Sequence, residues 1–382
     1  MCMRAPSSFQ DHFVSLTDPR SFHAPNQRHE LIDILVIAVC AVICGAEGWE
    51  DIEEYGKAQA EWFTEVLDLP NGIPGHDTFR RVLSRRVLSH LDPDELTQCF
   101  MSWTSALSDL SGGEIVAIDG KTLRHSFDRA ASKKAIHMVS AWASNNRLVL
   151  GQVKVDAKSN EITAIPKLLK MLDLTGATVT IDAMRCQKEI AKVLTEQGAD
   201  YVLALKKNHS HLYEDVTLFL DDARATEFAE IDHDYHETVD GDHGRIETRK
   251  YWITSDIDWL GAKASWTHLQ SLGLVESRRE IGEKVEIERR YYLVSLPADG
   301  VRFGNAVRQH WGVENGLHWV LDVSFNEDAC RIRKDKGAQT FSVLRHIALN
   351  LLKRESQYKR GIKARRKRAG WDRDYLLQVL TS

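Results

Sequence analysis

Three acidic side chains in this sequence have the types and spacing that chemistry on phosphodiester bonds would need. Asp119 follows the apolar run 116–118, and Asp182 follows the apolar run 179–181. If these runs are neighbouring parallel strands, both carboxylates emerge at one edge of a sheet. Glu314 falls in a segment of helical character and adds a third carboxylate from an element packed on that sheet. Hard oxygen ligands that converge from different elements are what two-metal phosphoryl transfer requires.

Each aspartate alone has a simpler explanation, because Asp is common as a turn or capping residue after a strand. The combination of three acids favours a metal site. His310, Glu314, His318 and Asp322 recur every four residues, so on a helix they share one face. Zinc binding would explain this face. A polar face lining an active-site cleft explains it as well, and we favour this reading because the three acids already account for Glu314.

The segment 111–205 carries the signals of a ribonuclease-H-like core. Short apolar runs bounded by turn residues predict strands, and runs with helical spacing predict helices. Their order along the chain gives a mixed sheet with helices on its faces, which is an α/β (α+β) fold. The expected strands are 115–118, 137–143, 148–155, 177–181 and 201–205, and the expected helices are 162–172 and 187–197.

Further segments surround this core. Residues 1–110 predict a helical N-terminal domain for DNA-end binding or assembly, with the apolar segment 31–44 as its central helix. The catalytic core is expected to be split by a β-rich insertion that contains a hairpin turning at Gly282–Glu283. The expected boundaries are 111–205 for the first part of the core, 206–298 for the insertion, 299–354 for the rest of the core with helices at 303–322 and 339–354, and 355–382 for a basic C-terminal tail.

The formal net charge of −5 does not by itself indicate a nucleic-acid partner, so a DNA-facing surface has to come from local basic segments. Lys121 and Arg124 follow Asp119, where contact with phosphate is natural, although a solvated loop explains them too. Arg80 and Arg81 lie on a predicted helix that fits either DNA recognition or packing. The last basic segment, a DNA arm or a solvated end, contains Lys363, Arg365, Arg366, Lys367 and Arg368.

The cysteines and the hydrophobic segments bear on the cellular compartment. Six cysteines without a CxxC pair argue against a zinc ribbon and fit a reducing cytosol. The most hydrophobic stretch, 34–44, is too short to span a bilayer, and residues 1–10 lack an apolar signal core. We therefore expect a cytoplasmic protein without a membrane partner.

Several motifs resemble those of the H-repeat-associated proteins, the ISAs1 branch of the IS4-type DDE transposases. They occur in the family's order and span most of the chain, which makes the resemblance specific. The matching segments are Gly72–Pro74 with His76–Arg81, Ala117–Arg124, Lys158–Pro166, Thr180–Met184, His243–Arg249 and His310–Val323.

The resemblance implies that Asp119, Asp182 and Glu314 are catalytic DDE residues and metal ligands. It implies Mg²⁺, with Mn²⁺ as a substitute, for DNA cleavage and strand transfer. The implied partner is double-stranded DNA, both insertion-sequence ends and target, with a homodimer assembled on it and a nucleoid-associated location in a bacterial cell. The alternatives are a catalytically decayed or domesticated transposase that acts as a DNA-binding protein, and a nuclease that performs no joining step.

The sequence departs from the family pattern where the family shows glycine, at His125, Arg185 and Lys207. A side chain costs about 1 kcal/mol or more at a position that needs positive φ. Arg185 is expected to matter most, because it follows Asp182 by three residues and would either repel the metal or contact a DNA phosphate. Further departures are a duplication, Arg80–Ser84 repeated as Arg85–Ser89, and the presence of Val307, His310 and Leu321 where the wider group places Tyr, Arg and Lys.

Overall fold

The computed structural model describes residues 11–18, 20, 27–84, 91–110, 112–128, 134–156, 160–182, 185–242 and 245–382. One mixed sheet of nine strands runs through the molecule. Its strands are β1 Ile115–Leu123, β2 Ile136–Ala143, β3 Leu148–Lys154, β4 Thr178–Ile181, β5 Asp200–Leu205, β6 Asp234–Asp242, β7 Arg245–Thr254, β8 Ser271–Ile281 and β9 Lys284–Val294. Their spatial order is β3-β2-β1-β4-β5-β9-β8-β7-β6.

The first five strands form the ribonuclease-H-like half of the sheet that the sequence predicts. Strands β1, β2 and β3 are antiparallel neighbours, whereas β4 and β5 run parallel to β1. Two helices, α7 Glu161–Lys170 and α8 Lys188–Glu196, connect β3 to β4 and β4 to β5. These helices bury one apolar stripe each, so the strands between them are covered and almost wholly hydrophobic. The predicted mixed sheet flanked by helices is confirmed.

The insertion continues this sheet instead of forming a separate one. Strand β9 pairs antiparallel with β5, and β8, β7 and β6 follow outward. The predicted strand 245–254 and the hairpin turn at Gly282–Glu283 are both present, and Gly282 has the positive φ that such a turn uses. Helix α9 Ser210–Ala225 was not predicted, although its buried Leu212, Val216 and Leu220 have helical spacing.

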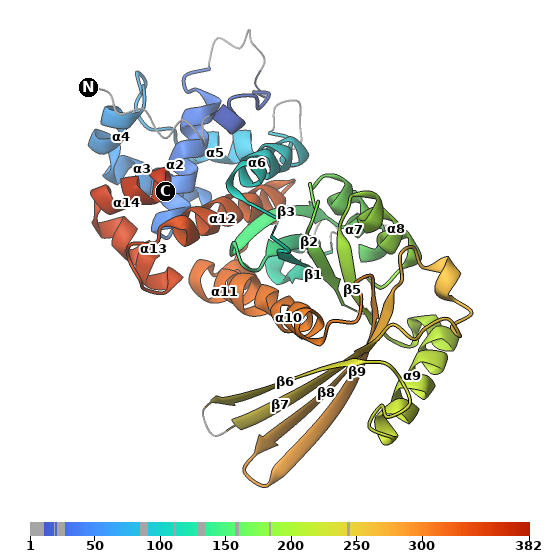
Figure 1. The fold of residues 1–382 in the computed structure, drawn as a ribbon. Helices are drawn as coiled ribbons and strands as arrows, with labels where there is room; N and C mark the ends of the chain where they lie inside the picture. Colours follow the sequence, from blue (N-terminus) through green and yellow to red (C-terminus); the bar gives the residue numbers. More distant parts are fainter. Residues whose placement is uncertain are drawn as a thin grey trace.

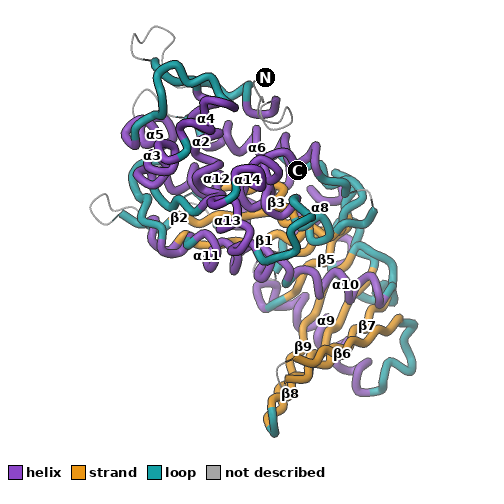
Figure 2. Tube along the Cα trace, turned by 90° about the vertical axis from the view of Figure 1, so that its left-hand side faces the viewer, coloured by secondary structure: helices purple, strands orange, loops and turns teal. Residues whose placement is uncertain are grey.

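Most helices gather at the opposite end of the molecule from strands β6–β9, and the C-terminus lies among them (Figure 1, Figure 2). The N-terminal helices are α2 Leu31–Cys44, α3 Trp49–Ala58, α4 Ala60–Val66, α5 His76–Ser84 and α6 Pro93–Leu107, and the C-terminal helices are α12 Gly337–Arg354, α13 Ile362–Trp371 and α14 Arg373–Thr381. Helix α2 is the predicted central helix, because it is buried from Ile34 to Ile43 and contacts α3, α12 and α13.

Two features of this helical end bear on the expected domain boundaries. The segment 355–382, expected as a basic C-terminal tail, contains α13 and α14, which pack against α2 and α12. One hydrophobic cluster runs without interruption from Phe13 through the catalytic sheet to Val379. The N-terminal helices therefore share a core with the rest of the chain and do not form a separate unit.

The helix expected at 303–322 is broken into three pieces. Helix α10 Gly300–His310 is followed by a π-helical turn, Glu314–His318, and then by α11 Trp319–Phe325. A π-helical turn inside an α-helix is a frequent mark of a functional site. None of the helices in the described part of the chain is long and apolar enough by itself to span a membrane. Only α2 and α3 taken together reach the length, and they meet at a bend of 95°.

Candidate active site

Asp119 and Asp182 occupy matching positions on neighbouring strands. Strands β1 and β4 pair in parallel from Ile115 with Thr178 to Ile118 with Ile181, and the two aspartates come next in each chain segment. Strand β4 ends there, as predicted. Strand β1 continues to Leu123, so the expectation that Asp119 ends its strand is wrong. The carboxylate of Asp119 therefore projects from a part of β1 that is still paired with β2 on one side and is no longer paired with β4 on the other.

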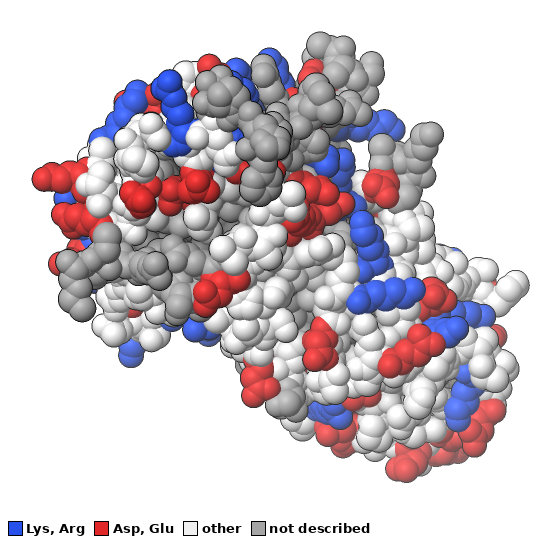
Figure 3. Space-filling view, turned by 90° about the horizontal axis from the view of Figure 1, so that it is seen from above, with Lys and Arg blue, Asp and Glu red and all other residues white. Residues whose placement is uncertain are grey.

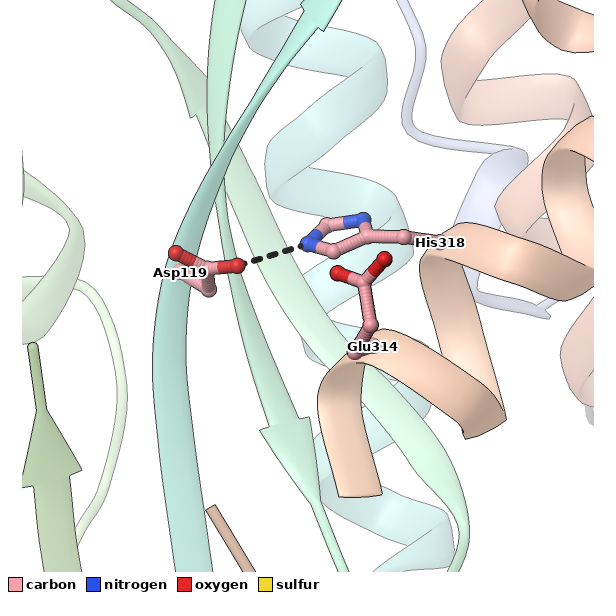
Figure 4. Close-up of side chains that lie close together, drawn as sticks. All are labelled: Asp119, Glu314 and His318. Atoms are coloured by element: carbon pink, nitrogen blue, oxygen red, sulfur yellow. Dashed lines mark hydrogen bonds and ion pairs between the residues drawn. The ribbon is translucent and has the colours of Figure 1, made fainter. Parts of the chain in front are cut away.

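Glu314 and His318 face Asp119 from the π-helical turn (Figure 4). Each of the three residues offers one potential ligand atom, and these atoms all lie within 4.8 Å of one another. His318 is buried, and its Nε2 lies 3.1 Å from Asp119 Oδ2, which is a hydrogen-bond distance. Glu314 is exposed and makes no ion pair with any residue in the described part of the chain. A carboxylate in this position is available to a cation.

Asp182 lines the same pocket as Asp119 and Glu314, a space of about 280 Å³. It is not part of the close cluster, and its Oδ1 lies 3.8 Å from Nζ of Lys206. Lys206 follows β5, the next parallel strand, and it also lines the pocket. The structure thus brings all three predicted acids to one cavity, with Asp182 held toward its lysine.

Arg185 points into this site and binds Asp119 directly. Its Nη1 lies 2.5 Å from Asp119 Oδ1, and its Nη2 lies 2.9 Å from Oε1 of Glu161, the first residue of α7. Glu161 also accepts a hydrogen bond from His137 of β2. A Cβ on Gly120 would meet the ends of the Glu161 and His137 side chains, so a larger residue there would have to displace them. Neither Glu161 nor His137 was predicted as a site residue, although Glu161 belongs to one of the matching motifs.

The electrostatics of the site favour an ionised Asp119. Burial by itself raises the pKa of Asp119, but the hydrogen bond with His318 and the bond and charge of Arg185 outweigh it and hold this pKa well below its usual range. Burial lowers the pKa of His310, which makes a hydrogen bond of 2.9 Å to Oγ1 of Thr180 on β4.

The four residues at every fourth position do not converge on one point: Glu314 and His318 lie together at Asp119, whereas the other two have partners elsewhere. His310 contacts Thr180, and Asp322 forms an ion pair with Lys121. Lys121 also lies 2.9 Å from the buried carboxylate of Glu327, and only 12% of its side chain is exposed. The ammonium group of Lys121 is therefore paired inside the protein, which does not favour the predicted contact with DNA phosphate.

The other predicted DNA contacts divide into exposed and internal ones. Arg124 is 76% exposed beside Asp328, Arg81 is exposed, and Arg80 is partly exposed and paired with Asp77. On the face drawn in Figure 3, basic and acidic side chains are interspersed. In α13, Lys363 and Lys367 are exposed. Arg365 donates a hydrogen bond to the backbone of α12, and Arg366 is buried against carbonyls at the end of α2. Arg368 lies over the rings of Tyr358 and Tyr375. Arg366 in particular cannot reach DNA in this fold.

The three positions where glycine was expected show no left-handed backbone. His125, Arg185 and Lys207 all lie outside the positive-φ region, so these residues do not have the backbone strain that a side chain causes at positive φ. The second copy of the five-residue duplication, residues 85–89, lies outside the described residues, as do residues 157–159, 183–184 and 243–244.

Comparison with known proteins gives a consistent result over nearly the whole chain. The DDE_Tnp_1-associated family matches residues 10–104, and the Transposase DDE domain family matches residues 110–351. The "H repeat-associated putative transposase YhhI" of Escherichia coli (strain K12) is 41% identical over 358 residues, which is 92% of each chain. The "Putative transposase YncI" of Escherichia coli O157:H7 is 42% identical over 360 residues, 93% of this chain and 90% of that relative. Among solved structures, a piggyBac transposase synaptic complex with hairpin DNA is similar with a TM-score of 0.46 and 12% identity, over 98% of this chain and 76% of that one.

Proposed function

The chain belongs to the Transposase DDE domain family, and we propose that Asp119, Asp182 and Glu314 are the residues with which it cuts and joins DNA. Membership makes the protein a transposase that uses divalent metal ions. The observation that supports these three residues best is that the sheet and the interrupted helix direct Asp119 and Glu314 at each other across a pocket that Asp182 also lines.

The donor set suits a hard cation. Three carboxylates supply the oxygen ligands that Mg²⁺ prefers, and Mn²⁺ accepts the same set together with a nitrogen such as that of His318. Two such ions, when bound, stabilise the attacking and leaving oxygens of an in-line displacement. The residues of the chain have supporting tasks. His318 orients Asp119, Lys206 lies beside Asp182, and the pairing of β1 with β2 holds the strand that carries Asp119.

The substrate that we propose is double-stranded DNA, namely the ends of the element that encodes the protein and a target site. Among the predicted DNA contacts, Arg81, Arg124, Lys363 and Lys367 are exposed and available for phosphate, and Arg80 is partly exposed beside Asp77. We expect two copies to assemble on a pair of ends, and we expect the protein to act at the nucleoid because its substrate is there.

Cleavage of the DNA that flanks the protein's own gene tests this function. With Mg²⁺, the purified protein should nick the element ends and join them to a plasmid target. Asp119→Asn, Asp182→Asn and Glu314→Gln should each lower the cleavage rate by at least about a hundredfold, since each removes several kcal/mol of metal-based stabilisation. Glu288→Gln is the matched control, because Glu288 lines the same pocket but pairs with Arg290, and it should keep most of the activity.

The outcomes separate the alternatives. Specific DNA binding without cleavage in either Mg²⁺ or Mn²⁺ would identify a decayed transposase that only binds DNA. Cleavage without joined products would identify a nuclease. Full activity in any of the three triad variants would contradict the residue assignment.

A further inference from the structure

A second pocket of about 490 Å³ lies on the other side of the segment that carries Glu314. We call it the rear pocket, and its lining includes Trp142, Arg147, Gln309, Asn315, Gly316 and Lys353. The lining comes from three places: the β2–β3 hairpin, the segment from the end of α10 into the π-helical turn, and the last turn of α12. No part of the catalytic triad reaches it.

Tight packing forms one wall of this pocket. A Cβ on Gly316 would lie 2.9 Å from Cζ2 of Trp142, so the π-helical turn rests directly on the indole. The ammonium group of Lys353 lies 4.7 Å from the centre of the same ring, in a cation–π contact. Trp142 is buried and therefore holds both the turn and the lysine in fixed positions.

The hairpin that presents Arg147 is also fixed. The backbone N–H groups of Asn145 and Asn146 donate to the two oxygens of buried Glu114, at 2.6 and 3.2 Å. Arg147 itself has φ 55°, a left-handed conformation that costs a residue with a side chain about 1 kcal/mol. The carboxylate of Glu114, which lies just before β1, is thus used by the backbone of this turn, and the arginine is held at the pocket rim.

The charges of the rear pocket are not neutralised from within the protein. Neither Arg147 nor Lys353 has an ion pair with a carboxylate in the described ranges, and Arg147 is exposed. Burial, together with the neighbouring charges of Arg147 and Arg365, lowers the pKa of Lys353 to about 8. The buried Oε1 of Gln309 has no hydrogen-bond partner there either, and a rotated amide would present its NH₂ group instead. An anion bound in the rear pocket would pair with the two cations and accept a hydrogen bond from the amide.

The position of the rear pocket relates it to the active site. His310, Val313 and Glu314 line the active-site pocket, whereas Gln309, Asn315 and Gly316 line the rear pocket, so a single helical segment separates the two. A helix with its side chains is about 10–12 Å wide, which corresponds to about three nucleotides of one strand at about 3.4 Å each.

We propose that the rear pocket is a phosphate-binding subsite for the DNA strand that crosses this segment, with Arg147 and Lys353 as its cationic contacts about three nucleotides from the reacting bond. The subsite rests on the proposed function, because its ligand is the same DNA. It also explains how the protein holds the DNA strand although Lys121 and Arg366 make their contacts inside the protein.

Chemical labelling of the unmodified protein tests this subsite. At pH 8 the amine of Lys353 should react readily with an acetylating reagent, because about half of it is uncharged. Saturation with duplex DNA carrying the element end should lower labelling of Lys353 at least about fivefold, because a phosphate both shields the amine and raises its pKa. Lys192, an exposed residue of α8 that lines neither pocket, is the control and should keep its reactivity.

Charge variants give a second measurement. Arg147→Gln and Lys353→Gln should each lower the slope of log affinity against log salt by about one unit, for any DNA sequence, whereas Lys353→Arg and Lys192→Gln should keep it. Unchanged labelling of Lys353 on DNA that is shown to bind, or unchanged slopes in both variants, would overturn the subsite. Protection of Lys353 without metal-dependent cleavage would contradict only the proposed catalytic function, and absence of DNA binding would contradict both.

Discussion

Asp119 is held by two side chains that have opposite consequences for a metal ion. His318 orients the carboxylate from the helix side and leaves its other oxygen open, whereas the guanidinium of Arg185 takes that oxygen at 2.5 Å. Arg185 is always charged and is fixed a second time by Glu161. A cation that binds Asp119 must therefore compete with an arginine that is already in place.

Replacing Arg185 should make the metal easier to bind. A hydrogen bond between charged groups is worth about 1.5–3 kcal/mol, so Arg185→Gly should lower the Mg²⁺ concentration for half-maximal cleavage about tenfold and raise the rate at low Mg²⁺. Arg185→Lys keeps the charge and should stay close to the original protein. Titration of cleavage with Mg²⁺ measures the effect. If Arg185→Gly instead weakens DNA binding and leaves the metal requirement unchanged, the arginine serves phosphate and not Asp119.

At the scale of single residues, the sequence predicts the acidic residues of the site but not the side chains that contact them. Asp119 and Asp182 could be found because each follows a short apolar run, which is a local signal. The pairing of Arg185 with Glu161, and of Lys121 with Glu327, joins residues that are 24 and 206 positions apart. No local pattern encodes such pairs, so the internal partners of Lys121 could not be predicted.

The π-helical turn is the element on which the position of Glu314 depends. Gly316 touches Trp142 so closely that even a methyl group would push the turn away from β2, whereas Gly312 has ordinary space, with its nearest neighbours 3.7 Å from a Cβ. The sequence predicts a continuous helix here because helical periodicity does not reveal one extra residue in a turn.

The two glycines give a matched pair of variants. Gly316→Ala should lower the cleavage rate at least about tenfold, because a displacement of about 1 Å at a reacting group can cost more than that. Gly312→Ala should be nearly neutral in activity and gain up to about 1 kcal/mol of stability from helix propensity. Cleavage rates and urea unfolding of both variants check this expectation. Equal activity in the two would show that Glu314 does not depend on the contact with Trp142.

Helix α12 contributes a buried histidine that makes stability depend on pH. Burial lowers the pKa of His346 from 6.5 to about 4, more than the nearby carboxylate of Glu327 raises it. As pH falls below 6.5 the unfolded chain takes up this proton and the folded chain does not, so the stability present above 6.5 is lost progressively toward pH 4.

The size of this loss can be measured against a variant. Between pH 7 and pH 5 the unmodified protein should lose about 2 kcal/mol more unfolding free energy than His346→Gln, as judged by urea denaturation. His211→Gln, at an exposed position of α9, should behave like the unmodified protein. A parallel loss in His346→Gln would assign the pH dependence to other groups.

At the scale of the whole molecule, the N- and C-terminal helices pack together and share one hydrophobic core. Helix α12 is buried along nearly its full length between α2, α5, α6 and β3, and Arg366 of α13 donates to the carbonyls of Val42 and Ile43. The sequence predicts α2, α5, α6 and α12 as helices but treats the segment that forms α13 as a tail, and it cannot indicate that segments some 300 residues apart share one core.

This shared core predicts the behaviour of fragments. A fragment of residues 111–382 exposes the apolar side of α12 that α2 covers, so it should aggregate when expressed alone. Co-expression with residues 1–110 should restore soluble protein, and the two fragments should purify together. A monomeric 111–382 fragment that unfolds cooperatively would contradict this expectation, and its affinity for element ends would then show whether the N-terminal helices recognise DNA.

The β8–β9 hairpin has a consequence for how proteins of this build can diverge. Its outer pairs, from Arg278 with Ile287 to Ile281 with Lys284, lie beyond the buried part of the sheet. Removing two residues from each strand would shorten the hairpin by about 7 Å and leave every remaining side chain on its original face, whereas removing one would reverse the faces at the tip. During evolution, the hairpin can therefore be lengthened or shortened in steps of two residues per strand while the catalytic end of the molecule stays unaltered.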